Sequence, residues 1–232
     1  KYFGKWNSYS DIKINFEVPA RNRTKFYFVH KSGSAQSEIR VGHITPKRDA
    51  NSFIPIKIMN TILGGQFSSR INLNLRERKG FTYGAHSSFH YFRDAGLFEV
   101  TTAVNTENSG QAVAEILNEL DGIRKNISTQ EIEFAKSYLI KQFPSRFETF
   151  NQVAKNYESL LVHSLPKDEL TYYTKKIETA TTDQIQEAAL NNIHPDGTII
   201  LVAGDREKIF DQLKSISGDD PVELDIYGNF LA

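Results

Sequence analysis

The chain has 232 residues, 39% of them hydrophobic, with 28 basic side chains, 28 acidic side chains and no cysteine. A formal net charge of zero argues against a nucleic-acid-binding protein, which normally carries a clear basic excess. The lack of cysteine excludes disulfide scaffolds, cysteine-ligated metal sites and a cysteine nucleophile, and no apolar run approaches the roughly 20 residues of a membrane-spanning helix.

The sequence starts at Lys1 rather than at methionine, and aromatic residues follow at once. We expect residues 1–10 to be a linker or the tail of a preceding domain. The remainder, 11–232, is expected to form one domain, because the length fits one large domain and no linker-like tract interrupts it.

The first part of the domain is predicted to form strands. Residues 11–18 alternate apolar and polar side chains with the period of two that is typical of a strand. Two more strands are predicted at 25–30 and 36–43. Three consecutive strands with short links favour an antiparallel arrangement within an α+β fold.

Two helices and a strand pair are expected next. Asp49 is a typical N-cap for an apolar-periodic helix that should stop at Gly64. A second helix is predicted over 70–79. A strand pair is predicted at 82–92 and 96–104.

The second half of the chain is mainly helical by its periodicity. Helices are predicted over 106–125, 131–146, 152–161, 167–177, 182–191 and 206–216. Residues 128–131 (STQE) resemble a capping box that opens the second of these helices, and Pro144 should disturb its last turn. The run 198–203 is continuously apolar, which is typical of a strand buried on both faces, and 222–227 is expected to be an edge strand. The sequence therefore predicts a single α+β domain with a largely antiparallel sheet and helices packed on one face.

Histidine pairs do not form a recognisable zinc motif. Neither H-E-x-x-H nor H-x-x-E-H occurs. His86 and His90 are four residues apart, but in a strand that spacing places them about 13 Å apart on one face, too far to share one zinc ion. We interpret them as surface or interface histidines.

A glycine-rich link could instead hold an anion. The segment 64–69 (GGQFSS) precedes a helix, where free amides favour negative charge. It lacks the lysine of a P-loop, so a helix C-cap followed by a serine N-cap is the simpler interpretation. The aromatic residues Phe89, Tyr91 and Phe92 fit a core stripe better than a pocket lining.

The run from Ser68 to Gly84 passes from a helix through a glycine turn into a strand. Arg76 falls in the last turn of that helix, where a cation suits the helix dipole, and Tyr83 begins the strand. From composition alone, these residues are a salt-bridged helix end and a half-buried tyrosine.

Residues 60–83 (NTILGGQFSSRINLNLRERKGFTY) resemble the signature of the second, metal-free domain of pitrilysin/insulinase-type zinc peptidases. Within this family, the chain resembles the bacterial homologues of mitochondrial processing peptidase. Segments 36–43 and 202–205 also fit this pattern. The resemblance implies paired α+β half-shell domains around a peptide chamber, with zinc bound by an H-x-x-E-H motif in the partner domain and no cofactor in this chain.

The resemblance also assigns roles. Arg76 and Tyr83 match the arginine and tyrosine, seven residues apart, that the metal-free domain contributes to the active site. The tyrosine hydroxyl helps to stabilise the tetrahedral intermediate, and the arginine helps to hold the substrate backbone. The implied function is proteolysis by a zinc metalloendopeptidase of which this chain, inactive alone, is one half.

The expected partners are a zinc-bearing domain or subunit and a peptide substrate, without nucleic acid or membrane insertion; a homodimer of the isolated domain stays open. The main alternative is an inactive scaffold or protein-interaction subunit of a related complex, and a third is an anion-binding enzyme that uses 64–69. For a bacterial protein, both periplasm and cytoplasm remain open as compartments.

Overall fold

A six-stranded mixed sheet organises the chain. The computed structural model describes residues 2, 5, 18–19, 23–49 and 51–231, so most of the strand predicted at 11–18 lies outside the described residues. The strands are β1 (Lys25–His30), β2 (Gln36–Thr45), β3 (Thr82–Tyr91), β4 (Gly96–Asn105), β5 (Ile199–Gly204) and β6 (Val222–Leu224). They lie in the order β3-β4-β2-β5-β1-β6.

Antiparallel and parallel pairings are segregated across this sheet. β4 pairs antiparallel with β3 and β2, and β2 pairs antiparallel with β5, whereas β1 pairs parallel with β5 and β6. The α+β class is confirmed, with a mixed rather than wholly antiparallel sheet. The last strand is an edge strand as predicted, although it is shorter than 222–227.

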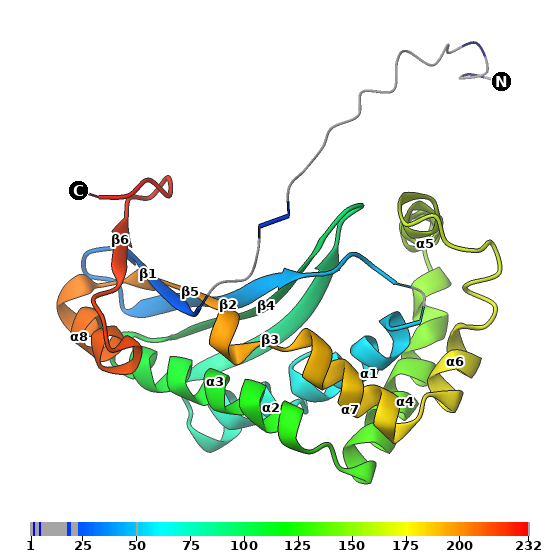
Figure 1. Cartoon of the computed structure of the whole chain (residues 1–232), viewed down its shortest axis with the longest axis horizontal. Helices are drawn as coiled ribbons and strands as arrows, with labels where there is room; N and C mark the ends of the chain where they lie inside the picture. The colour runs from blue at the N-terminus through cyan, green and yellow to red at the C-terminus, as the bar shows by residue number, and fades with distance from the viewer. Residues whose placement is uncertain (1, 3–4, 6–17, 20–22, 50, 232) are drawn as a thin grey trace.

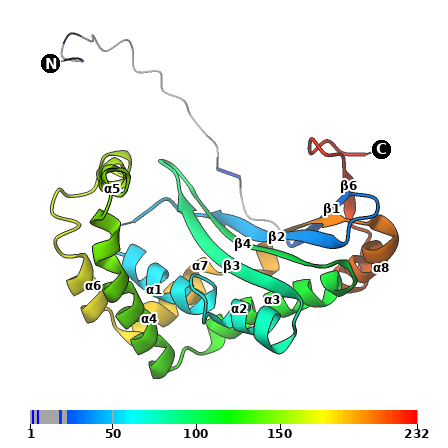
Figure 2. The same cartoon turned by 180° about the vertical axis from the view of Figure 1, so that it is seen from behind.

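The helices cover one face of the sheet, as expected (Figures 1 and 2). They are α1 (Phe53–Leu63), α2 (Arg70–Asn72), α3 (Ser109–Lys125), α4 (Thr129–Gln142), α5 (Phe150–Val162), α6 (Tyr173–Thr179), α7 (Thr182–Asn192) and α8 (Arg206–Ser217). None of the helices in the described part of the chain is long and apolar enough to cross a membrane.

Local sequence signals account for most helix ends. The N-cap of α1 is Ser52 rather than the predicted Asp49, whose carboxylate accepts the backbone amides of Asn51 and Ser52 at 3.1 and 2.8 Å in the turn before the helix. Ser128 and Glu131 form the predicted capping box of α4. This helix ends at Gln142, before Pro144, and continues as a 3₁₀ turn.

The prediction that 198–203 is buried on both faces is wrong. Ile200 and Val202 are fully buried, but Ile199 is 53% exposed. The helices cover only one face of the sheet and leave the other face uncovered (Figure 1). Alternate residues of β5 point to that uncovered face, so they are not buried.

The core lies between the sheet and the helices. Its largest fully buried side chains include Phe28, Ile39 and Phe98 from the strands and Ile58, Met59, Leu63, Ile116 and Leu120 from the helices. The end of α1 is also fixed directly to β3, because the amide of Ser87 donates to Gly64 O at 3.0 Å and Asn60 bonds to Ser87 through its side chain. This attachment holds the segment that follows α1 against the sheet.

Candidate functional site

The segment that precedes β3 is a π-helix where the sequence predicts an α-helix. α2 gives way to the π-helical segment η1 (Leu73–Arg78), which contains Arg76. The amide of Lys79 bonds to Asn74 O, five residues back, and Gly80 reverses the chain with φ +67°. The wider turn places Arg76 differently from the position that an α-helix would give it, and such π-segments occur frequently at functional sites.

Polar contacts with α3 support this π-helix. The buried side-chain amide of Asn74 donates to Glu115 Oε2 at 2.9 Å and to Glu119 Oε1 at 2.8 Å. Lys79 Nζ lies 2.7 Å from Glu115 Oε1. Hydrogen bonds from Lys79 and Asn74 lower the pKa of Glu115, so its carboxylate stays charged and anchors both ends of the turn.

The guanidinium of Arg76 stacks on an aromatic ring. Its Cζ lies 4.3 Å from the ring centroid of Phe67, and its side chain is 33% exposed. Nη1 lies 3.4 Å from Glu77 Oε1, a neighbour in the same turn, and has no hydrogen bond to any described residue. Nη1 is buried, so the stacking holds the guanidinium in place and only the donors on its exposed side can reach another molecule.

Tyr83 lies on a β-bulge that turns its side chain into solvent. The register of β3 against β4 slips after Thr82, which faces Val104, and resumes at Ala85, which faces Thr102. Tyr83 is 92% exposed, so it is not the half-buried tyrosine that composition suggests. Bulges of this kind re-aim a side chain beside active sites.

Two side chains hold the bulge. The Thr82 hydroxyl accepts the amide of Gly84 at 3.0 Å and donates to Ala103 O at 2.7 Å. Asn72, buried in the preceding helix, accepts the amide of Ala85 at 2.9 Å and donates to Phe67 O at 2.7 Å. Asn72 therefore links the strand that carries Tyr83 with the loop that carries the ring under Arg76.

The site residues predicted from the sequence thus belong to two packed elements, since η1 and β3 contact each other. Sequence reasoning missed the supporting residues Phe67 and Asn72. A phenylalanine within the otherwise small and polar link 64–69 was the available signal for Phe67, whereas nothing local distinguishes Asn72.

The predicted histidine pair lies in β3 as expected. His86 faces Thr101 and His90 faces Leu97 in the sheet register, which places both on one face. His90 Nε2 lies 3.0 Å from Glu99 Oε1. Across the residues that the structure describes, no three His, Asp or Glu side chains gather as a metal site.

The glycine-rich link 64–69 uses its amides internally. Gly64 N and Gly65 N both bond to Asn60 O, and Ser68 N bonds to the side chain of Gln66. Ser69 is the N-cap of α2 but makes no capping bond with its side chain. Because most of its backbone amides already donate hydrogen bonds within the protein, the segment has few donors left to bind an anion.

The aromatic residues that follow Tyr83 along β3 divide between core and surface. Phe89 packs against the core, and Tyr91 lies against Phe53 at 5.8 Å between ring centroids. Phe92, beyond the end of the strand, is 60% exposed. The core interpretation therefore holds for Phe89 and fails for Phe92, whereas Tyr91 lines a cavity.

Comparison with known proteins gives a consistent result. A family model described as the peptidase M16 inactive domain matches residues 1–139. A protein named as an uncharacterised zinc protease of Mycobacterium tuberculosis is 24% identical over 164 residues, which is 66% of this chain and 35% of that protein. The chain therefore spans about a third of this relative's length.

Two solved structures share the fold. A peptidase M16 inactive domain from Pseudomonas fluorescens superposes with a TM-score of 0.75 and 22% identity, covering 83% of this chain and 46% of that one. A chain of Complex III2 from Candida albicans gives a TM-score of 0.67 and 14% identity, covering 82% of this chain and 48% of that one.

Proposed function

Because this chain belongs to the peptidase M16 inactive-domain family, we propose that it is the metal-free half of a zinc metalloendopeptidase and contributes Arg76 and Tyr83 to a partner's active site. The partner would be a domain with an H-x-x-E-H motif, on the same chain or a separate one, and the substrate a peptide held between the halves. The observation that carries the proposal is the exposed Tyr83 on its bulge, next to the element that bears the stacked Arg76.

The two side chains suit the roles proposed for them. The Tyr83 hydroxyl, free in solvent, can donate a hydrogen bond to the oxyanion that develops when a peptide carbonyl is attacked. The Arg76 guanidinium can donate to backbone carbonyls of an extended peptide. When bound in the partner, zinc would activate the attacking water. This chain would bind and orient the peptide and would stabilise the negative charge that develops on it.

A scaffold role is the second candidate. The likeness to a chain of Complex III2 from Candida albicans favours it, because that protein is named as part of an assembly and not as a protease. A pure scaffold has no use for a solvent-exposed tyrosine held on a bulge, so dependence of hydrolysis on Tyr83 separates the two candidates.

Zinc content and hydrolysis of a fluorogenic peptide test the proposal. They are measured on this chain alone, on the zinc-bearing half alone and on the two together. We expect activity and zinc in the combined sample, and neither in this chain by itself. Stoichiometric zinc on the isolated chain would contradict the metal-free assignment, and a combined sample without zinc or activity would favour the scaffold.

A further inference from the structure

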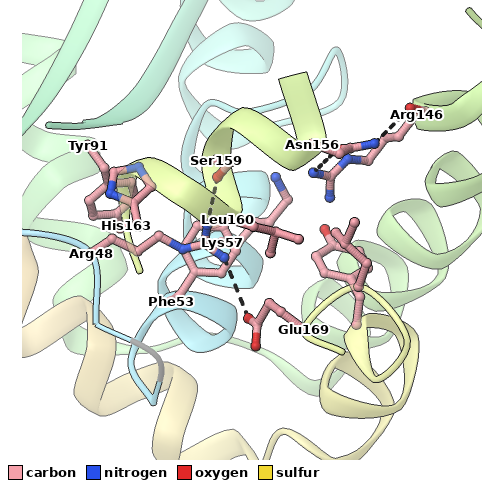
Figure 3. A pocket seen from close by; sticks show the side chains of 12 residues that line it. Arg48, Phe53, Lys57, Tyr91, Arg146, Asn156, Ser159, Leu160, His163 and Glu169 are labelled. Atoms are coloured by element: carbon pink, nitrogen blue, oxygen red, sulfur yellow. Dashed lines mark hydrogen bonds and ion pairs between the residues drawn. The ribbon is translucent and has the colours of Figure 1, made fainter. Parts of the chain in front are cut away.

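A polar cavity lies at the other end of β3 from Tyr83. It is enclosed by α1, α5 and the turn before α6, and its volume is about 170 Å³ (Figure 3). Its lining includes Arg48, Lys57, Tyr91, Arg146 and Glu169. Tyr91 is eight residues beyond Tyr83, roughly 26 Å along an extended strand, so this cavity is separate from the proposed active-site segment.

Arg48 is a buried cation in the wall of the cavity. Its side chain is 8% exposed, and its guanidinium lies 3.8 Å from the ring centroid of Phe53. Nη1 donates to Ser159 Oγ at 2.9 Å, and Nη2 lies 3.5 Å from Glu169 Oε1. Nε is buried and has no hydrogen-bond partner among the residues described, which is costly for a charged donor.

One carboxylate, that of Glu169, pairs with two cations here. Glu169 is 5% exposed; one oxygen faces Arg48 and the other lies 2.6 Å from Lys176 Nζ. Arg146 donates to the neutral side chain of Asn156 at 2.6 Å, and in the described structure neither Arg146 nor Lys57 pairs with a carboxylate. The cavity therefore carries an uncompensated positive charge.

The cations interact unfavourably with one another. Burial, then the charges of Arg146 and Arg48, lower the pKa of Lys57 to about 8. Burial also lowers the pKa of Arg48. The Tyr91 hydroxyl is buried nearby and makes no hydrogen bond within the described part of the chain. An anion in the cavity would supply both the missing negative charge and acceptors for these donors.

We propose that this cavity binds a phosphate group, either inorganic phosphate or the terminal phosphate of a small phosphorylated molecule, through Arg48, Lys57 and Arg146. The donors come from three separate elements: the segment before α1, α1 itself and the 3₁₀ turn after α4 (Phe143–Phe147). Donors on several sides suit a tetrahedral anion, whereas a single guanidinium fork satisfies a planar carboxylate. The volume is several times the ~30 Å³ that one water molecule occupies in the liquid.

Calorimetric titration of the full protein tests this site. The probes are inorganic phosphate, glycerol 3-phosphate as a phosphate ester and acetate as a carboxylate. We expect one phosphate per chain, a melting temperature raised by roughly 3–6 °C at ten times Kd, and much weaker binding of acetate. Tighter binding of glycerol 3-phosphate than of phosphate would identify an ester as the occupant; the reverse would identify the free ion.

Two variants locate the binding. Lys57→Met and Arg146→Gln should each weaken phosphate binding by about tenfold or more, because each removes a charge-assisted hydrogen bond. Lys155→Met, an exposed lysine of α5 that does not line the cavity, is the matched control and should bind as wild type. No phosphate binding at tens of millimolar, equal affinity for acetate, or equal losses in the control would overturn the proposal. Hydrolysis enters none of these readouts, so the outcome is independent of the proposed protease role.

Discussion

The side-chain oxygen of Asn72 accepts the backbone amide of Ala85 at 2.9 Å, and so joins the helix before the glycine turn to the strand after it. The same side chain donates to the backbone carbonyl of Phe67, and the Arg76 guanidinium lies over the ring of Phe67. Asn72 is 1% exposed. One buried amide thus fixes the supports of both proposed active-site residues.

Asn72→Ala should destabilise the domain and impair catalysis. It leaves the buried amide of Ala85 and the partly buried carbonyl of Phe67 without partners, which costs about 1–3 kcal/mol. Urea unfolding measures that loss, and kcat/KM of the assembled enzyme should fall although Arg76 and Tyr83 are both present. Asn72→Asp keeps the acceptor for Ala85 but sets a buried carboxylate oxygen against Phe67 O, so it should destabilise the domain at least as much as alanine. An alanine variant with normal stability would show that these bonds contribute little.

Arg76→Ala and Tyr83→Phe should each lower kcat/KM of the assembled enzyme by about 10²–10³-fold, if each removes one contact made in the transition state. Unfolding free energy of the Tyr83 variant should change by less than about 0.5 kcal/mol, because this hydroxyl lies in solvent. Matched controls are Tyr227→Phe, at an 83% exposed tyrosine, and Arg78→Ala in the same π-helix. Full activity of the two site variants would refute their proposed roles.

Gly64→Ala should destabilise the domain, whereas Gly122→Ala should stabilise it. A Cβ on Gly64 would lie 2.6 Å from Ser87 N in β3, so the junction between α1 and the sheet would have to move, at about 1–3 kcal/mol. A Cβ on Gly122, inside α3, meets nothing closer than 3.9 Å and should add about 0.5–1 kcal/mol of helix stability. Thermal unfolding of both variants provides the comparison; shifts of the same sign would contradict it.

Glu131 should contribute stability that disappears in acid. Burial alone would raise its pKa, but hydrogen bonds from Arg70 and Ser128 outweigh that effect and lower the pKa to about 2. The contribution is therefore complete above the unfolded pKa of about 4.5 and is lost as the pH falls towards 2. Glu131→Gln should cost about 1–2 kcal/mol at pH 7 and almost nothing near pH 2. Glu133→Gln, exposed on the same helix, is the control and should show no such trend.

Lys57→Met should stabilise the domain near neutral pH in a buffer without phosphate. The lysine is charged in both states below pH 8, so its burial is a penalty there. Between pH 8 and 10.5 the folded state has lost the proton that the unfolded state keeps, and the penalty shrinks as pH rises. The variant should gain up to about 3 kcal/mol at pH 7, and the gain should vanish near pH 10.5. A gain that does not change with pH would indicate a packing effect instead.

Local patterns predicted most of the elements. The boundaries of β1 agree with the predicted strand at 25–30, and the Ser128–Glu131 capping box forms as expected. Asp49 bonds the turn before α1, three residues ahead of the actual N-cap Ser52, and α4 ends just before Pro144. Each of these features depends on backbone sterics and hydrogen bonds within a few residues, so the sequence contains the whole cause.

By itself, the sequence determined the α+β class, the seven-residue spacing of Arg76 and Tyr83, and the family resemblance. Only the tertiary structure decided that Arg76 lies on a π-helix and that Tyr83 lies on a bulge in solvent. Contacts with α3 and β4 impose both of these distortions, and no local pattern encodes them. The cluster of Arg48, Lys57 and Arg146 likewise joins positions up to 98 residues apart, so its charge excess exists only once α1, α5 and the turn before α6 enclose a common cavity.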